Sequence, residues 1–414
     1  AYMYYFCTSS SWIHSVIGYA VSKTVHGPYK NVTPIIYSGF TKDKKENGDN
    51  NTKNDIYTNT NVDQLIKSHR ISGFNSKWIR ENGTYNNDYA PNAIDPNITK
   101  DSKGNLWLAY GSWSGGIYIL PINKVTGQPI YPGKDGTNKY GQNVDRYFGT
   151  HLIGGYHMSG EAPYIKYDPQ TKYYYLFVTY GGLNRTGGYN MRVFRSKHIT
   201  SKYVDDQGHT PNYTSWETND PTKQSNQKYG VKLEGNYSFS CLPYAYMSPG
   251  HNSVYIDNNH NWYLFNHTRF NNGTENHQLR VKQMIMTSDG WPIPLPFEYT
   301  GHELSINSSN IPNITKQIPG KYEFIDNGTD TNPNPIKPKE ITLMPDHQIT
   351  GAIRGLWSIN QKENTLLVTL NTTEGKYVGE FKLQQDESKE RNNVLVFSVQ
   401  GNNKVLWGVK KYQK

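Results

Sequence analysis

Apolar and polar residues alternate in short runs along most of the chain, a pattern that is typical of β-strands and not of helices. Three segments repeat one arrangement: a short strand, a polar turn that opens with aspartate, and an aromatic-rich strand. The turns begin at Asp101, Asp168 and Asp257. Such hairpins, separated by further short strands and long loops, predict an all-β fold and favour a β-propeller with four-stranded antiparallel blades over a sandwich.

The repeat also aligns three ionisable residues. Asp95 and His251 each lie six residues before their turn aspartate, and Glu161 lies seven before its own. The first strand of each propeller blade lines the central channel, so we expect these side chains to converge at one mouth of that channel. Each residue alone would be an ordinary turn or cap residue; their shared register favours convergence.

Two carboxylates that face each other across a cleft are the minimal apparatus for glycoside hydrolysis, and one of them has to stay protonated. Glu161 has glycine, alanine and proline as neighbours, which solvate an anion poorly, so we expect it to be the acid. Asp95 lies near Asn92 and Asn97, and hydrogen bonds from such neighbours would keep it ionised.

Metal binding is the competing role for these residues. The chain lacks the spaced histidine and cysteine pairs of a zinc site, so a hard cation held largely through water near His251 is the more plausible ion. The two cysteines, Cys7 and Cys241, lie in predicted strands and are expected to be buried free thiols without a disulfide.

Composition narrows the partners of this 414-residue chain. The net charge of +9 comes from scattered lysines and arginines, which argues against a nucleic-acid partner. No apolar run is long enough to span a bilayer, so we expect no membrane partner. The 34 tyrosines and 9 tryptophans suit both stacking on sugars and packing in twisted sheets.

Several short motifs, taken together and in order, resemble family 43 of the glycoside hydrolases, specifically the endo-α-1,5-L-arabinanases. The motifs are NAIDPN at 92–97, YGSWSGG at 110–116, GEAPY at 160–164 and GHNS at 250–253. The resemblance covers most of residues 1 to about 303. It implies a five-bladed propeller, hydrolysis of arabinan with inversion of configuration, and a secreted enzyme.

The resemblance also implies residue roles. Glu161 matches the general acid, Asp95 the aspartate that tunes and positions that acid, and His251 the histidine of a central calcium site. The candidate sugar contacts are Trp113, Tyr180, Arg269, Asn92 and Ser112. For the two aromatic residues sheet packing stays an equal alternative, and for the arginine a structural ion pair.

One expected feature departs from the family pattern. The family's general base is an aspartate at the start of the first blade, whereas residues 1–10 resemble the second strand of a blade. We therefore expect the base about ten residues upstream of Ala1, on a segment that completes blade 1 and that has been removed or lies in a separate chain. Otherwise the chain is inactive as given. Four blades are recognisable, and residues 41–90 are a candidate for the fifth or for a long rim loop.

The predicted domains are a propeller over 1–303, a linker over 304–320 and an all-β barrel or sandwich over 321–414. That last domain is similar to the C-terminal module of extended arabinanases. Trp357 and Trp407 lie in apolar strands, so we expect it to buttress the propeller. We expect a monomeric endo-arabinanase. The alternatives are an exo-acting arabinofuranosidase or β-xylosidase of the same fold, and a non-catalytic carbohydrate-binding propeller.

Overall fold

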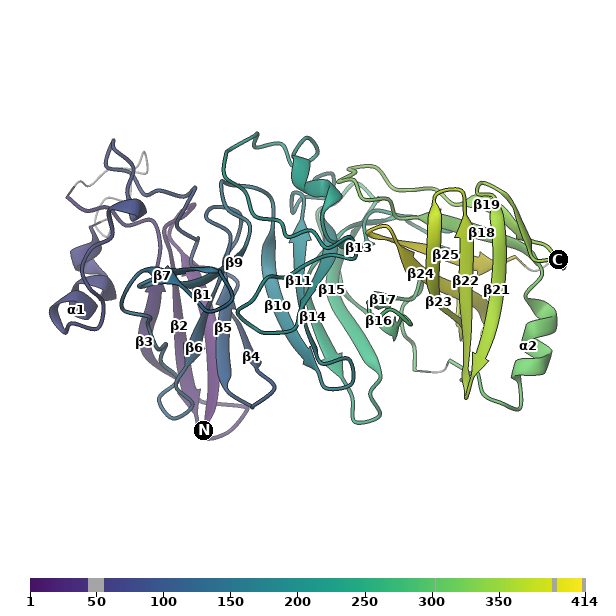
Figure 1. Cartoon of the computed structure of the whole chain (residues 1–414), viewed down its shortest axis with the longest axis horizontal. Helices are drawn as coiled ribbons and strands as arrows, with labels where there is room; N and C mark the ends of the chain where they lie inside the picture. The colour runs from purple at the N-terminus through teal and green to yellow at the C-terminus, as the bar shows by residue number, and fades with distance from the viewer. Residues whose placement is uncertain (44–55, 302, 389–392, 412–414) are drawn as a thin grey trace. The chain divides into compact units, whose positions relative to one another are not determined.

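The computed structural model describes residues 1–43, 56–301, 303–388 and 393–411, and β-strands make up most of their regular secondary structure (Figure 1). No helix in the described part of the chain is long and apolar enough to cross a membrane. The helices are α1 (Asn61–Lys67), α2 (Ile311–Gln317) and the 3₁₀ turns Tyr57–Asn59, Ser76–Trp78 and Ser225–Lys228. The chain divides into two compact units. The first comprises Ala1–Thr179, Phe194–Val204 and Thr210–Asn226, and the second Tyr180–Val193, Asp205–His209 and Gln227–Lys414.

The first unit is built from antiparallel sheets joined by loops. One sheet has the order β1-β2-β3, and another has the order β4-β5-β6-β9-β8-β7. Strands β10 and β11 form a third antiparallel pair. The strands are β1 (Tyr2–Ser9), β2 (Ser15–Ser22), β3 (Lys30–Tyr37), β4 (Asn97–Lys100), β5 (Leu106–Tyr110), β6 (Ile117–Ile122), β7 (Gly136–Thr137), β8 (Asn143–Asp145), β9 (Gly149–Ile153), β10 (Glu161–Asp168) and β11 (Tyr173–Tyr180).

The second unit contains a four-stranded sheet, β14-β15-β16-β17, and a C-terminal barrel. The barrel runs in order from β18 to β25 and closes because β25 pairs with both β24 and β18. The strands are β12 (Asn190–Ser196, which extends past the second unit), β13 (Val231–Glu234), β14 (Tyr246–Ile256), β15 (Trp262–Phe270), β16 (His277–Met286), β17 (Pro292–Pro294), β18 (Gly320–Asp326), β19 (Lys339–Leu343), β20 (Gln348–Gly351), β21 (Gly355–Lys362), β22 (Thr365–Thr372), β23 (Gly375–Gln384), β24 (Val394–Gly401) and β25 (Lys404–Lys410).

The predicted repeat of hairpins is confirmed. Strand pairs β4–β5, β10–β11 and β14–β15 are antiparallel and enclose the three turns that open with aspartate. In each turn the carboxylate of Asp101, Asp168 or Asp257 accepts hydrogen bonds from backbone N–H groups two to four residues further along the chain. This side-chain-to-backbone bonding fixes the reversal of direction, and it explains why aspartate recurs there.

Aromatic residues fill the core of the first unit. The ring of Phe40 packs edge-on against Trp78, with centroids 5.7 Å apart, and against Tyr85, at 5.4 Å. The buried Tyr110 of this core keeps its hydroxyl group bonded, since it donates to the Phe148 carbonyl at 2.8 Å. The tyrosines of this core therefore serve packing, because each ring buries a large area while its hydroxyl group can bond a backbone or side-chain partner.

The segment 41–90 was a candidate for a fifth blade, and its described parts do not support that prediction. Residues 56–90 carry α1 and two 3₁₀ turns, and neither they nor residues 41–43 contain a β-strand. Thr60 caps α1, since its hydroxyl accepts a hydrogen bond from the Val62 N–H. Residues 44–55, which the rim-loop prediction also covers, lie outside the described residues.

The C-terminal β domain was expected to be a barrel or a sandwich, and it is a closed barrel. Trp357 and Trp407 are buried in it, as their apolar strands indicated. The indole N–H of Trp407 donates to the Pro294 carbonyl at 2.9 Å, which ties the barrel to β17. Helix α2 occupies part of the predicted linker 304–320. An all-β chain that ends in a β domain is confirmed, and the division at residues 303 and 320 stays a prediction.

Both cysteines are free and half-buried rather than fully buried. Cys7 lies in β1, as predicted. The prediction of a strand at Cys241 was wrong, because this residue lies in a turn between β13 and β14.

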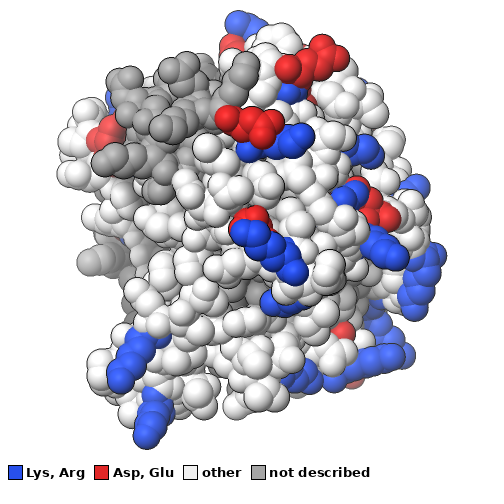
Figure 2. Space-filling model, turned by 90° about the vertical axis from the view of Figure 1, so that its left-hand side faces the viewer, with Lys and Arg blue, Asp and Glu red and all other residues white. Residues whose placement is uncertain are grey.

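Charged side chains are dispersed on the face shown in Figure 2, where acidic residues lie among the basic ones. Several cations of the first unit are paired. The Lys67 ammonium lies 2.6 Å from Asp63, and the Arg146 guanidinium lies 2.8 Å from Asp135. On this face the net positive charge therefore does not form one basic block, in agreement with the scattered cations of the sequence.

Candidate functional site

Glu161 is the first residue of β10, and two residues that follow β5 fix its carboxyl group. The indole N–H of Trp113 donates to Oε2 at 3.0 Å, and the Ser112 hydroxyl is 3.2 Å from the same oxygen. The indole can only donate, so Oε2 has to act as an acceptor. A protonated Glu161 would therefore carry its proton on Oε1. This arrangement sets which oxygen can deliver a proton.

Asp95 lies two residues before β4, next to the strand that carries Glu161. Its Oδ2 accepts a hydrogen bond from the backbone N–H of Ala162 at 3.1 Å. The side-chain oxygen of Asn97 accepts a hydrogen bond from the Ile165 N–H at 2.9 Å, and a bond from its amide group to Asp95 stays a prediction. The structure thus brings Asp95 and Glu161 to the junction of two hairpins, and the bond to Ala162 fixes the backbone beside the candidate acid.

At the position six residues before each turn aspartate, the three hairpins share one backbone conformation, although their residue types differ. Asp95, Ala162 and His251 each lie six residues before their turn aspartate, and their φ angles are 56°, 54° and 49°. Left-handed backbone is costly for residues other than glycine, by roughly 1–3 kcal/mol, and such residues cluster at functional sites. The structural equivalent of Asp95 is therefore Ala162, and Glu161 lies one residue earlier.

The other predicted sugar contacts have packing or hydrogen-bonding partners in their own units. Asn92 is buried, and its side-chain oxygen accepts a hydrogen bond from the Ser38 hydroxyl at 3.2 Å. Tyr180 is 2% exposed, beneath the Arg192 guanidinium at 4.9 Å from the ring centroid. Arg269 pairs with Glu275 at 3.0 Å, which matches the structural alternative for it. A sugar contact by these residues stays a prediction.

His251, the predicted calcium residue, is exposed on β14 at an irregular stretch of the pairing with β15. Among the described residues, no three His, Cys, Asp or Glu side chains gather closely enough to hold a metal ion by themselves. The neighbouring Asn252 is buried, and neither its amide oxygen nor its amide nitrogen has a hydrogen-bond partner among the described residues. This set fits an ion bound mostly through water, with an amide oxygen as the kind of ligand that Ca²⁺ accepts.

Sequence reasoning missed two residues close to the carboxylates. Burial raises the pKa of the Cys7 thiol and outweighs a hydrogen bond with the Asp95 backbone that lowers it, so Cys7 is a neutral neighbour of Asp95. The His157 ring lies 5.4 Å from that of Trp113. Burial lowers its pKa, which favours the neutral imidazole at neutral pH. No motif pointed to either residue, because both come close only through the pairing of distant hairpins.

The chain matches two family models. Residues 35–292 match glycosyl hydrolases family 43, and residues 296–408 match the C-terminal lipocalin-like domain of that family. The chain is 36% identical to the extracellular endo-α-(1→5)-L-arabinanase of Thermotoga petrophila, over 99% of this chain and 77% of that protein. It is 35% identical to the extracellular endo-α-(1→5)-L-arabinanase 2 of Bacillus subtilis, over 99% and 76%.

Solved structures agree. The crystal structure of endo-1,5-α-L-arabinanase from Thermotoga petrophila covers 99% of this chain and 81% of its own, with a TM-score of 0.77 and 34% identity. A family 43 glycoside hydrolase from Bacillus licheniformis gives a TM-score of 0.78 at 32% identity, with the same coverage. The family resemblance drawn from the motifs is confirmed. With both family models matched in order and this similarity along its whole length, the chain belongs to family 43 of the glycosyl hydrolases.

Proposed function

We propose that this hydrolase is an extracellular endo-arabinanase that cleaves internal α-1,5-L-arabinofuranosidic bonds of arabinan with inversion of configuration. The observation that carries the proposal is the fixed carboxyl group of Glu161, held through Oε2 by Ser112 and Trp113. It is supported by the similarity, along the whole chain, to proteins named extracellular endo-α-(1→5)-L-arabinanases. A five-bladed propeller, with its axial channel at Asp95, Glu161 and His251, is part of the same proposal.

In this mechanism Glu161 donates the proton on Oε1 to the leaving glycosidic oxygen. Asp95 positions that acid, because its carboxylate holds the Ala162 N–H and thereby fixes the start of β10. A fixed anion at Asp95 also disfavours ionisation of Glu161 before the bond breaks. Inversion also needs a general base, which would activate water roughly 6.5–9.5 Å from the acid.

A calcium ion near His251 is a further part of the proposal, supported by the buried, unpartnered amide of Asn252. His251 and Asn252 would hold it together with water. When bound, the ion would supply positive charge and ordered water to the channel. His267 follows on β15, and burial lowers its pKa to about 4, so that it stays neutral beside a cation.

The test is product analysis on linear α-1,5-arabinan. The expected result is an early ladder of oligosaccharides whose newly formed anomeric centre is inverted. Release of arabinose alone would mean exo action, and xylose release from xylo-oligosaccharides would mean a β-xylosidase.

Glu161→Gln is the matched variant, because it removes the proton donor and little volume. We expect hydrolysis to fall by at least about a thousandfold while the affinity for oligosaccharides stays within a factor of two. Binding of arabino-oligosaccharides without hydrolysis by the wild-type protein would favour the non-catalytic alternative. Full turnover by Glu161→Gln would reject the assignment of the acid.

A further inference from the structure

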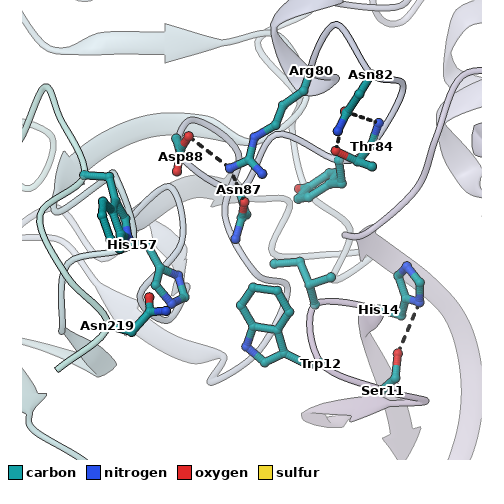
Figure 3. A pocket seen from close by; sticks show the side chains of 13 residues that line it. Ser11, Trp12, His14, Arg80, Asn82, Thr84, Asn87, Asp88, His157 and Asn219 are labelled. Atoms are coloured by element: carbon teal, nitrogen blue, oxygen red, sulfur yellow. Dashed lines mark hydrogen bonds and ion pairs between the residues drawn. The ribbon is translucent and has the colours of Figure 1, made fainter. Parts of the chain in front are cut away.

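The first unit contains a pocket of about 860 Å³ beside the candidate site. Two exposed tryptophans line it: Trp12, which is 64% exposed, and Trp216, which is 55% exposed. Single exposed apolar side chains are ordinary, whereas two tryptophans that line one pocket offer it a shared apolar surface. Figure 3 shows Trp12 in the pocket, with His157 and Asn219 beside it. The pocket therefore offers flat aromatic surface within a polar surround.

Contacts lead from this pocket to the candidate acid. The ring of His157 lies 5.5 Å from that of Trp12, nearly perpendicular to it, and 5.4 Å from that of Trp113. Trp113 in turn donates its indole N–H to Glu161. The aromatic row Trp12–His157–Trp113 thus runs between the pocket and Glu161. One long substrate could therefore place one sugar unit in the pocket and another at Glu161.

The internal repeat supports the same reading. Ser11-Trp12 follows β1 as Ser112-Trp113 follows β5, so two neighbouring sheets present a Ser-Trp pair at equivalent loops. One tryptophan bonds Glu161, and the other reaches into the pocket. A groove that uses both loops would extend past the acid toward the first sheet.

The polar wall of the pocket selects the class of ligand. The Arg80 guanidinium lies 2.9 Å from the Asp88 carboxylate and donates to Asn87 at 2.6 Å (Figure 3). Because this cation is already paired with an anion, the wall has no excess charge to attract a phosphate or a carboxylate. Its guanidinium, carboxylate and amide groups are instead donors and acceptors for neutral hydroxyl groups. A purely apolar ligand would leave these groups unsatisfied.

We propose that this pocket is a remote subsite that binds an arabinofuranosyl unit of the polymer, several units from the bond that is cleaved. The inference rests on the proposed function, because it assumes an arabinan chain at Glu161. Trp12 and Trp216 supply stacking surface, and the wall of Arg80 and Asp88 hydrogen-bonds the hydroxyl groups.

The experiment compares chain lengths. For Trp12→Ala and Trp216→Ala, kcat/KM is measured on arabino-octaose and on the shortest oligosaccharide that the wild-type protein cleaves. We expect the ratio of the long to the short substrate to fall about fivefold or more in each variant, with most of the loss in KM. Trp12→Phe, which keeps an aromatic face, should recover much of the ratio. Tyr244→Ala, which removes an exposed aromatic residue of the second unit, serves as the control and should leave the ratio unchanged.

Two other outcomes of this comparison would contradict the proposed subsite. An unchanged ratio would mean that no sugar stacks on these rings. An equal loss on both lengths would mean that Trp12 acts only through His157 and Trp113 on the acid. Failure of the wild-type protein to cleave any arabinan would instead reject the proposed function, so the two failures are distinguishable. As a second readout, Glu161→Gln with and without Trp12→Ala should differ about fivefold or more in Kd for arabino-octaose.

Discussion

The hydrogen bond from Trp113 to Glu161 makes a quantitative prediction about the pH dependence of hydrolysis. Trp113→Phe removes the indole N–H and keeps an aromatic ring in place. A hydrogen bond to a carboxylate contributes about 1.5–3 kcal/mol, and one to a neutral carboxyl group about 0.5–1.5 kcal/mol. In the wild-type protein this bond therefore stabilises the ionised form of Glu161 over the protonated form by about 1 kcal/mol. Because 1.4 kcal/mol corresponds to one pH unit, Glu161 of the variant should lose its catalytic proton at a pH that is higher by about 0.7.

The assay is the pH profile of kcat/KM on linear arabinan, whose alkaline limb reports the acid of the free enzyme. We expect this limb to move to higher pH by about half a unit to one unit, and the maximal rate to fall as Oε2 loses an anchor. Trp107→Phe is the matched control, because that indole N–H donates to the turn carboxylate of Asp101 at 3.1 Å. The control should leave the limb where it is. A limb that stays fixed in Trp113→Phe, or that moves to lower pH, would contradict the assignment of Glu161 as the proton donor.

Three further predictions follow from neighbouring features. Asp95→Asn keeps the size of the side chain and removes its charge, so kcat on arabinan should fall about a hundredfold or more; a loss below threefold would argue against its positioning role. Burial lowers the pKa of His151 to about 4. Its unfolded value is near 6.5, so the unfolded chain binds more protons between these values and stability should fall as pH drops through that window. His151→Gln should flatten this part of the melting curve against pH, and an unchanged slope would assign the loss to other groups. Gly111→Ala should lower Tm by about 4 °C or more, since φ is +126° and the new Cβ would lie 2.4 Å from the Gly116 carbonyl oxygen. Gly136→Ala, where a Cβ meets nothing within 4 Å, is the control.

Local sequence patterns predicted the fold well where the bonds that fix a hairpin lie within that hairpin. The turn aspartates at 101, 168 and 257 bond their own backbone, so strand, turn and strand were visible in the sequence. The second half of the chain was predicted at the level of strands. Closure of the barrel was not, because the pairing of β18 with β25 joins residues that lie eighty or more positions apart.

The candidate site was predicted less completely, and for the same reason. Register in the repeat brought out Asp95 and Glu161, whereas the bond between Asp95 and the Ala162 N–H depends on how two hairpins meet. His157 lies in a loop, and no periodicity places it beside Trp113. Cys241 was expected in a strand, and it lies in a turn instead.

The left-handed kink shared by residues 95, 162 and 251 has a consequence for how such a chain can diversify. The kink occurs with an acid, a methyl group and an imidazole alike, so it is a property of the hairpin and not of the side chain it presents. Each hairpin thus holds whichever residue stands at this position in the same backbone conformation. A β-branched residue would not be accepted there, whereas asparagine or glycine would be accommodated easily. A substitution at one of these positions can therefore change the functional group presented there without a change in the sheet behind it.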